Sequence, residues 1–345
     1  SNHLIISAAS MPQTIIGSRQ IRQREDTSRG KQQARHNTIP EIDMFEYLTV
    51  SKPENQPGIA VVSLNRPRKR NAINAQLWKE IGTVFGQLGT AGDDVRCVLL
   101  RGTGKAFCAG IDTSDASFGL VGSSSSSSAD DEDDDDNEEG GAAVDTARRV
   151  LSFRPQIIEM QAAITSLERC PIPVVAAIHG FCIGAGVDLI TAADVRICSP
   201  NSIFSVREAR LGLAADVGTL QRLPKVVGHS SRIRELCFTG EDFGSDEAAR
   251  IGLVSRISQS DDSLVEEGLA ICRLIAGNSP VAVTGTKLSL NYSRDHTVAD
   301  GLEHIATHNA AALITDDIIN SLVSPSDSRD GGGSRFARLL PIARL

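Results

Sequence analysis

The sequence predicts an α/β fold followed by a helical C-terminal region. Short runs of β-forming residues alternate with helical patterns from Phe45 to Val206, and helical patterns dominate from Thr219 onward. The composition, with 41% hydrophobic and 23% charged residues in 345, is that of a globular protein large enough to bury a sizeable core. Strands covered by helices in this way can place a ligand at the loops beyond the strand ends.

The first part of the predicted core alternates strands with amphipathic helices. Asn74 is a favourable N-cap, and apolar residues recur after it at helical spacing. The run 95–102 is almost wholly apolar, as expected of a parallel strand covered on both faces. We expect strands at 45–50, 59–65, 95–102, 173–180, 195–199 and 203–206, and helices at 74–88, 145–169 and 184–195.

The second part is predicted to be largely helical. Helical patterns occupy 219–228, 230–240, 246–252, 261–277 and 280–323. We therefore expect four segments: a leader at 1–44, a core at 45–260, a C-terminal helical region at 261–325 and a tail at 326–345.

The net charge of −8 is concentrated in one segment of low complexity. Six serines at 123–128 precede DDEDDDDNEE at 130–139, and without its nine acids the chain would carry about +1. Such a segment has nothing to bury and repels itself, so we expect a disordered insertion at 120–142. An alternative is that it binds a basic partner.

Several function classes are disfavoured by composition. A pI near 5.4 argues against nucleic acid as a partner, and no apolar run approaches the roughly 18 residues of a membrane span. The seven cysteines form no CxxC pair and the seven histidines are scattered, so we expect neither a metal site nor a disulfide framework.

Two glycine-containing turns, 105–112 and 179–188, each follow a predicted strand. Glycine lets the backbone approach a ligand, and the first N–H groups of a helix are free to donate. If the turns converge, two N–H groups could stabilise one oxygen that becomes negative during a reaction. The alternative is a pair of tight turns in a Rossmann-like sheet, although the phosphate-loop and GxGxxG patterns are both absent.

Three acids lie near these turns: Asp188, Glu208 and Asp216. Asp216 is surrounded by apolar residues, and a desolvated carboxylate can move protons near neutral pH. Each acid also has a structural alternative. Asp188 could be a helix N-terminal charge, Glu208 could pair with Arg207 or Arg210, and Asp216 could cap the helix that follows.

Four motifs together resemble the crotonase, or enoyl-CoA hydratase/isomerase, superfamily: SLNRPRKRNAIN (63–74), KAFCAGID (105–112), residues 173–197 and residues 204–228. The resemblance covers about 45–325 and implies a spiral of ββα units with a C-terminal helical region, assembled as trimers or hexamers that bind acyl-CoA thioesters. It also implies an oxyanion hole with backbone donors at Ile111 and Ala185, within the loops Ala109, Gly110, Ile111, Asp112 and Ala185, Gly186.

Within that superfamily the three acids resemble those of the Δ3,5-Δ2,4-dienoyl-CoA isomerases. The resemblance implies Asp216 as the base at C2, Glu208 as the acid at C6 and Asp188 as the residue that tunes Glu208, with no metal or redox cofactor. Two alternatives remain: an enoyl-CoA hydratase that uses Asp188 and Glu208, and a non-catalytic interaction protein with the same fold.

The resemblance also bears on phosphate binding and localisation. It places the basic cluster 66–70 near the CoA nucleotide, so Arg66, Arg68 and Lys69 are candidate phosphate contacts, with an exposed basic turn as the alternative. Ala343-Arg344-Leu345 matches a peroxisomal or glycosomal import signal, which predicts binding to the import receptor. The arginine-rich leader favours mitochondria instead.

Overall fold

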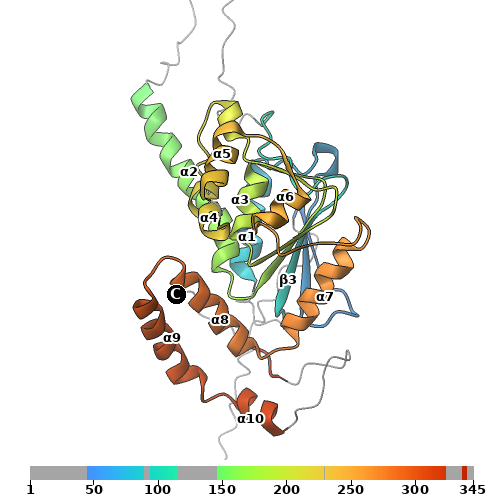
Figure 1. Ribbon diagram of the computed structural model, residues 1–345, viewed down its shortest axis with the longest axis vertical. Coiled ribbons are helices and arrows are strands. Elements are labelled where there is room, and N and C mark those ends of the chain that lie inside the picture. Colours follow the sequence, from blue (N-terminus) through green and yellow to red (C-terminus); the bar gives the residue numbers. More distant parts are fainter. Residues whose placement is uncertain (1–44, 89–93, 116–145, 229, 324–335, 340–345) are drawn as a thin grey trace, which may run out of the picture. The chain divides into compact units, whose positions relative to one another are not determined.

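The computed structural model describes residues 45–88, 94–115, 146–228, 230–323 and 336–339, all within one unit, His36–Leu345 (Figure 1). The predicted leader 1–44 and the predicted acidic insertion 120–142 lie outside the described residues, as does most of the tail.

A six-stranded sheet forms the centre of the core, with the strand order β1-β2-β3-β4-β6-β9. β1 pairs with β2 antiparallel, and the other neighbours are parallel. The three central strands β2, β3 and β4 are almost wholly buried because helices cover both faces of the sheet. The strands are β1 (Leu48–Ser51), β2 (Ile59–Leu64), β3 (Cys97–Gly102), β4 (Val174–Ile178), β6 (Val195–Cys198) and β9 (Arg256–Ile257).

The two faces of this sheet carry different helices. Val98 and Leu100 of β3 join the larger core with α1 (Ala75–Gln87), α2 (Thr146–Arg169) and α3 (Ala185–Ala192). Leu99, the residue between them, faces the opposite way and packs in the smaller core with α7 (Leu264–Ala276). This alternation follows from the two-residue period of a strand.

A second sheet of three short strands lies next to the first helix turn of α3. β5 (Phe181–Ile183) pairs in parallel with β7 (Ile203–Ser205), which pairs antiparallel with β8 (Phe243–Gly244). The remaining elements of this part are the 3₁₀ turns η2 (Pro67–Lys69) and η4 (Glu208–Leu211), and the helices α4 (Thr219–Val226), α5 (Ser230–Thr239) and α6 (Ser245–Arg250).

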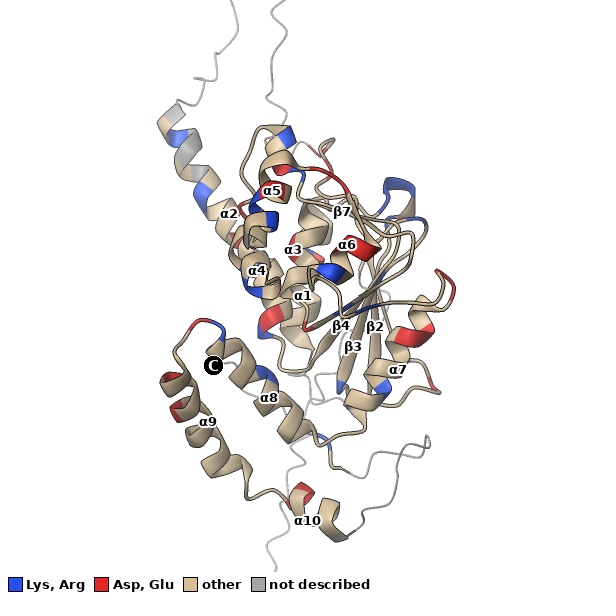
Figure 2. Ribbon diagram, viewed as in Figure 1, with Lys and Arg blue, Asp and Glu red and all other residues tan. Residues whose placement is uncertain are grey.

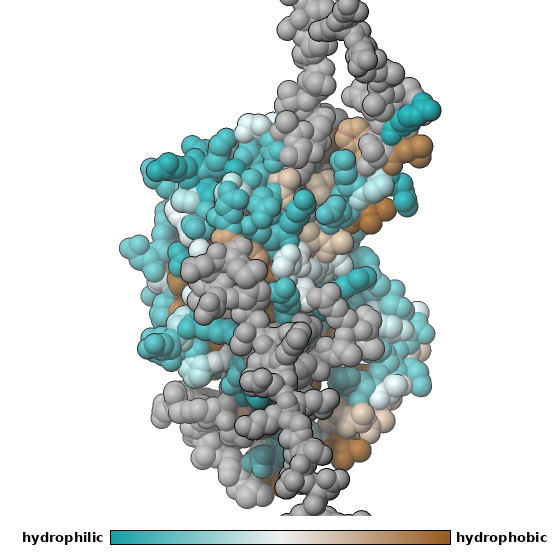
Figure 3. Space-filling view, turned by 180° about the vertical axis from the view of Figure 1, so that it is seen from behind, coloured by the Kyte–Doolittle hydropathy of each residue, from teal (hydrophilic) through white to brown (hydrophobic). Residues whose placement is uncertain are grey.

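Three helices follow α7 in the described part of the chain: α8 (Pro280–Ser293), α9 (Val298–Ala312) and α10 (Asp316–Val323). The buried Lys287 of α8 anchors them to the core, because its Nζ lies 2.7 Å from Asp194 Oδ2 and donates to the carbonyl oxygens of Leu167 and Ile172. Seen from behind, the described surface is mostly hydrophilic with separate apolar patches (Figure 3).

The predicted α/β core and helical C-terminal region are confirmed. The stretch 280–323 is three helices rather than one, since turns interrupt it near Arg294 and Thr315. β5, β8 and β9 were not expected as separate strands, and each has only two or three residues. In the described part of the chain, no helix is both long enough and apolar enough to cross a membrane.

Candidate active site

Backbone hydrogen bonds hold the two glycine-containing turns side by side. Phe107 N donates to His179 O at 2.8 Å, Cys108 N donates to Phe181 O at 3.0 Å, and Ile183 N donates to Cys108 O at 2.9 Å. The turns therefore converge, as the oxyanion hypothesis requires.

Ile111 and Ala185, whose backbone N–H groups are the two candidate donors, both line one cavity of about 1960 Å³. Ile73 fixes the first, because its N–H donates to Gly110 O and its carbonyl accepts from Asp112 N. Ala185 is the first residue of α3, where a helix leaves its N–H groups without internal acceptors. Within the described residues, neither N–H group has an acceptor.

Glycine is required at two points of this arrangement. Gly184, the N-cap of α3, has φ +52° and ψ −116°, a conformation that other residues avoid. A Cβ atom there would lie 3.9 Å from Gly110 Cα and 3.2 Å from Glu208 Oε1. At Gly186 a Cβ would lie 3.0 Å from Cys108 Cβ, so α3 could not approach the first turn as closely.

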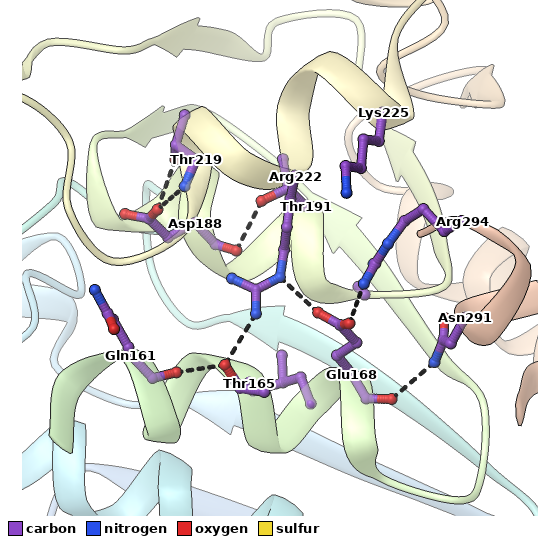
Figure 4. Close-up of polar contacts among 12 residues, drawn as sticks. Gln161, Thr165, Glu168, Asp188, Thr191, Thr219, Arg222, Lys225, Asn291 and Arg294 are labelled. Atoms are coloured by element: carbon purple, nitrogen blue, oxygen red, sulfur yellow. Dashed lines mark hydrogen bonds and ion pairs between the residues drawn. The ribbon is translucent and has the colours of Figure 1, made fainter. Parts of the chain in front are cut away.

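Asp188 is buried behind the cavity in the first turn of α3 and does not line it. Its Oδ1 accepts from the backbone N–H and the hydroxyl of Thr219, at 2.5 and 2.7 Å, so it binds the first turn of α4 (Figure 4). Its Oδ2 is buried and has no partner among the described residues. Burial raises the pKa of Asp188 to about 7, with a further contribution from the negative charge of Glu208, while the Thr219 hydrogen bonds oppose the rise.

Glu208 begins η4 and faces the cavity beside Gly184. It is 8% exposed, and its Oε2 has no partner among the described residues. Burial raises the pKa of Glu208, and the charge of Asp216 raises it further. The two neighbouring arginines bind elsewhere: Arg207 pairs with Asp242, and Arg210 donates to Thr239 O.

Asp216 also lines the cavity, but it is half-buried rather than buried. It does not cap α4, whose N-cap is Gly218 with no side-chain cap. Gln161 of α2 holds this loop, because its Nε2 donates to Asp216 O at 2.6 Å. The structure thus brings the two carboxylates of Glu208 and Asp216 to one cavity, with Asp188 behind them.

The basic cluster 66–70 before α1 has Lys or Arg at four of its five positions, and Lys and Arg are blue in Figure 2; its members differ in burial. Arg66 is mostly buried: it stacks on Tyr47 and lies 3.0 Å from Asp112 Oδ2. Asp112 therefore holds the loop together and does not line the cavity. A hydrogen bond from the Ser114 hydroxyl is the main cause of its lowered pKa. Arg68 is exposed, and Lys69 Nζ lies 3.8 Å from Asp112 Oδ1.

Sequence reasoning missed residues that line the cavity. Arg70 is one of them: its backbone has φ +50°, and its guanidinium carbon lies 5.7 Å from the Phe181 ring centroid. It stood in the basic cluster that the sequence singled out, but spacing alone did not separate it from its neighbours. The apolar wall comes from α1 and α2, and their helical pattern gave no sign of the face that a ligand would meet. Its members include Trp78, Phe85, Phe153, Ile157 and Met160.

Comparisons with known proteins agree with this geometry. Residues 54–133 and 152–322 match the enoyl-CoA hydratase/isomerase family. The chain is 39% identical to a mitochondrial Δ3,5-Δ2,4-dienoyl-CoA isomerase of Mus musculus, over 90% of each chain, and 38% identical to a peroxisomal one of Arabidopsis thaliana, over 86% of this chain and 99% of that one. It also resembles the crystal structure of an enoyl-CoA hydratase from Bacillus anthracis, with a TM-score of 0.69 and 25% identity over 84% of this chain and 99% of that one. The predicted crotonase fold is confirmed.

Proposed function

We propose that this chain, which belongs to the enoyl-CoA hydratase/isomerase family, converts 3,5-dienoyl-CoA thioesters into 2,4-dienoyl-CoA thioesters in the oxidation of unsaturated fatty acids. The observation that carries the proposal is the pair of carboxylates, Glu208 and Asp216, that line the same cavity as the backbone donors of Ile111 and Ala185. The dienoyl-CoA isomerases among its relatives give the proposal further support.

The oxyanion donors lower the barrier to removing a proton from C2. Loss of that proton delocalises negative charge over the diene and onto the thioester oxygen. Two fixed N–H groups stabilise that oxygen more in the transition state than in the substrate, and one such donor is worth about 2.7–4 kcal/mol. Ile111 N and Ala185 N would bind this oxygen.

Two separate carboxylates are needed because the proton leaves C2 and another arrives at C6. Asp216, half-buried at the cavity wall, takes the proton from C2 in the proposed reaction. Glu208, whose pKa is raised, gives its proton to C6. Only protons move and the bonds shift within the substrate, so the reaction needs no metal or redox cofactor.

The test is a direct assay of the purified chain with 3,5-dienoyl-CoA and, side by side, 2-enoyl-CoA. Formation of the conjugated 2,4-dienoyl thioester, followed by its ultraviolet absorbance, is the expected result. Hydration of 2-enoyl-CoA without isomerisation would support a hydratase that uses Asp188 and Glu208 instead. No turnover of either substrate by folded protein would favour a non-catalytic role, and the proposed activity would be wrong.

The assigned base is tested by Asp216→Asn, which keeps the shape of the side chain but cannot accept the proton. We expect kcat to fall by about 10²–10⁴ with a small change in KM. Asp242→Asn is the matched control, since Asp242 also lines the cavity but pairs with Arg207. An Asp216→Asn protein with full kcat would contradict the assignment.

The CoA phosphates are proposed to meet the exposed side of the basic cluster. Arg68 and Lys69 are exposed there, and Arg70 lines the cavity, whereas the Arg66 guanidinium is already bound by Asp112. Replacing Arg68 and Lys69 together by Gln should raise KM without lowering kcat. An unchanged KM at low salt, where phosphate contacts count most, would remove both residues from the proposal.

The chain is also proposed to form homotrimers or homohexamers. α9, α10 and the turn between them expose large apolar side chains, among them Leu302, Ile314, Ile319 and Leu322, each at least 60% exposed. Light scattering should give a mass of three or six chains, and a monomer at micromolar concentration would contradict this.

Import into peroxisomes or glycosomes is proposed from Ala343-Arg344-Leu345, with mitochondria as the alternative from the leader. A fluorescent fusion that leaves the C-terminus free should lose its organellar location when these three residues are deleted. Unchanged location would favour the leader.

A further inference from the structure

Helix α4 joins two sets of polar contacts, one with Asp188 and one with the end of α2 and the C-terminal helices (Figure 4). Thr219 binds Asp188 at the start of α4, and Arg222 lies one turn later on the same helix. The Nε of Arg222 donates to Glu168 Oε2 at 2.6 Å. Glu168, near the end of α2, also pairs with Arg294, which follows α8.

Arg222 is held in one orientation beside Asp188. Its side chain is 12% exposed, and its Nη2 donates to Thr165 Oγ1 at 2.9 Å. Its Nη1 occupies the space that a side chain at Gly218 would fill: a Cβ there would lie 1.9 Å from Nη1 and 3.8 Å from Asp188 Oδ1. A planar guanidinium that is bound to two fixed acceptors has little rotational freedom left, so its positive charge stays next to Asp188.

We propose that Arg222 is a positioning residue of the active site, which fixes the α4 turn on Asp188 and supplies a positive charge that favours the ionised form of Asp188 beside Glu208. The inference rests on the proposed function for its catalytic consequence. Its physical part, the effect of Arg222 on Asp188, holds whatever the substrate is.

The groups that face Asp188 show why this charge matters. Glu208 faces Asp188 from η4. Besides burial, the negative charge of Asp188 also raises the pKa of the thiols of Cys108, in the first glycine turn, and of Cys182, in β5. Arg222 faces it from α4, with Glu168 of α2 behind the guanidinium. Attraction by Arg222 lowers the pKa of Asp188, whereas burial and the charge of Glu208 raise it to about 7.

The consequence for catalysis follows from repulsion between like charges. Repulsion between the two carboxylates acts in both directions, so a negative charge on Asp188 makes Glu208 harder to ionise. If Arg222 is lost, Asp188 stays protonated to a higher pH, and this repulsion weakens near neutral pH. Glu208 then loses its proton more readily, and the step that protonates the substrate slows.

The test combines a titration with kinetics in the full chain. The carboxyl ¹³C resonance of Asp188, assigned with Asp188→Asn, is followed against pH in the wild type, Arg222→Gln and Arg222→Lys. We expect Arg222→Gln to raise the Asp188 midpoint by about one pH unit, within the range for removing a close opposite charge. Arg222→Lys keeps the positive charge but loses the two-acceptor geometry, so its Asp188 midpoint should lie close to that of the wild type.

Kinetics then separate positioning from a merely structural role. At pH 7, Arg222→Gln should lower kcat about tenfold with KM within about twofold of the wild type, and Arg222→Lys should recover part of kcat. Arg232→Gln is the matched control, because Arg232 pairs with Glu235, Glu241 and Glu247 on the surface. It should change neither the titration nor kcat.

An unchanged Asp188 midpoint in folded Arg222→Gln would overturn the inference, and so would an equal loss of kcat in Arg222→Lys and Arg222→Gln. If Arg222→Gln does not fold, Arg222→Lys decides alone: a midpoint near the wild-type value with lowered kcat supports the positioning role. Should the wild type not isomerise dienoyl-CoA, the proposed function fails, while the titration still tests the effect of Arg222 on Asp188.

Discussion

Replacing Asp188 by Asn should stabilise the folded chain at neutral and alkaline pH. Asp188 is fully buried, and one of its carboxylate oxygens has no partner among the described residues. The pKa of this group is raised to about 7 from an ordinary value of 3.8, so the folded state keeps the proton to a higher pH than the unfolded state. Stability is therefore lost as the pH rises from about 4 to about 7, and the loss is then complete.

The loss of stability is set by the difference between the two pKa values of Asp188, 3.8 and about 7. At 1.36 kcal/mol for each pKa unit, the ionised Asp188 lowers the free energy of unfolding by about 4 kcal/mol above pH 7. Asparagine keeps an oxygen for the two Thr219 donors, and the stronger hydrogen bonds that a carboxylate accepts from them are already included in the pKa of about 7. The gain in the free energy of unfolding should be about 4 kcal/mol at pH 8 and close to zero at pH 4.

Urea denaturation of the wild type and Asp188→Asn, followed by circular dichroism between pH 4 and pH 8, measures the difference directly. Other titrating groups cancel between the two proteins. Asp295→Asn is a control of opposite sign, because Lys225 lowers the pKa of that exposed carboxyl and its loss should cost less than about 1 kcal/mol. A difference between wild type and Asp188→Asn that does not grow with pH would refute the reasoning.

Three further predictions concern other parts of the site and its support. Lys287→Met leaves Asp194 and two buried carbonyl groups without their ammonium partner, so the free energy of unfolding should fall by about 3–5 kcal/mol. Calorimetry should show a lower melting temperature, and a loss of less than about 1 kcal/mol would contradict the anchoring role. Gly184→Ala puts a Cβ 3.2 Å from Glu208 Oε1 in a backbone conformation that alanine avoids. We expect kcat to fall more than tenfold and the free energy of unfolding to fall by about 1–3 kcal/mol. A wild-type kcat would show that the loop adapts. Gln161→Leu frees the Asp216 carbonyl, and we expect lower kcat with unchanged circular dichroism; full kcat would mean that the loop holds itself.

Periodicity predicted the elements whose burial repeats along the chain. The predicted helix at 74–88 is α1, because its apolar face packs in the core and Asn74 accepts a hydrogen bond from Leu77 N at its start. The strand predicted at 95–102 is β3, within two residues. β8 and β9 have two residues each, which is too short for any repeat, and they exist because neighbouring strands offer hydrogen-bond partners.

The sequence also identified the two glycine turns and the three acids, but it could not show whether the turns meet or which of these residues are buried. That the turns converge depends on pairing between Cys108 and Cys182, which are 74 positions apart. Arg66 and Arg68 look alike in the sequence, yet Arg66 is bound by Asp112 and Arg68 is exposed. Contacts of this kind depend on segments far apart in the chain, so no local pattern records them.

The three acids differ in burial, and this difference gives each a separate role in the proposed reaction. Asp216, the proposed base, is half-buried, so its carboxylate stays partly hydrated. Glu208, the proposed acid, is mostly buried, and burial together with the charge of Asp216 raises its pKa, which favours its protonated form. Asp188 is buried completely, and among the described residues the Thr219 donors and the charge of Arg222 offset part of the cost of ionisation. Because proton transfer in one direction needs a base and an acid with separated affinities, three equally exposed carboxylates could not perform it as well.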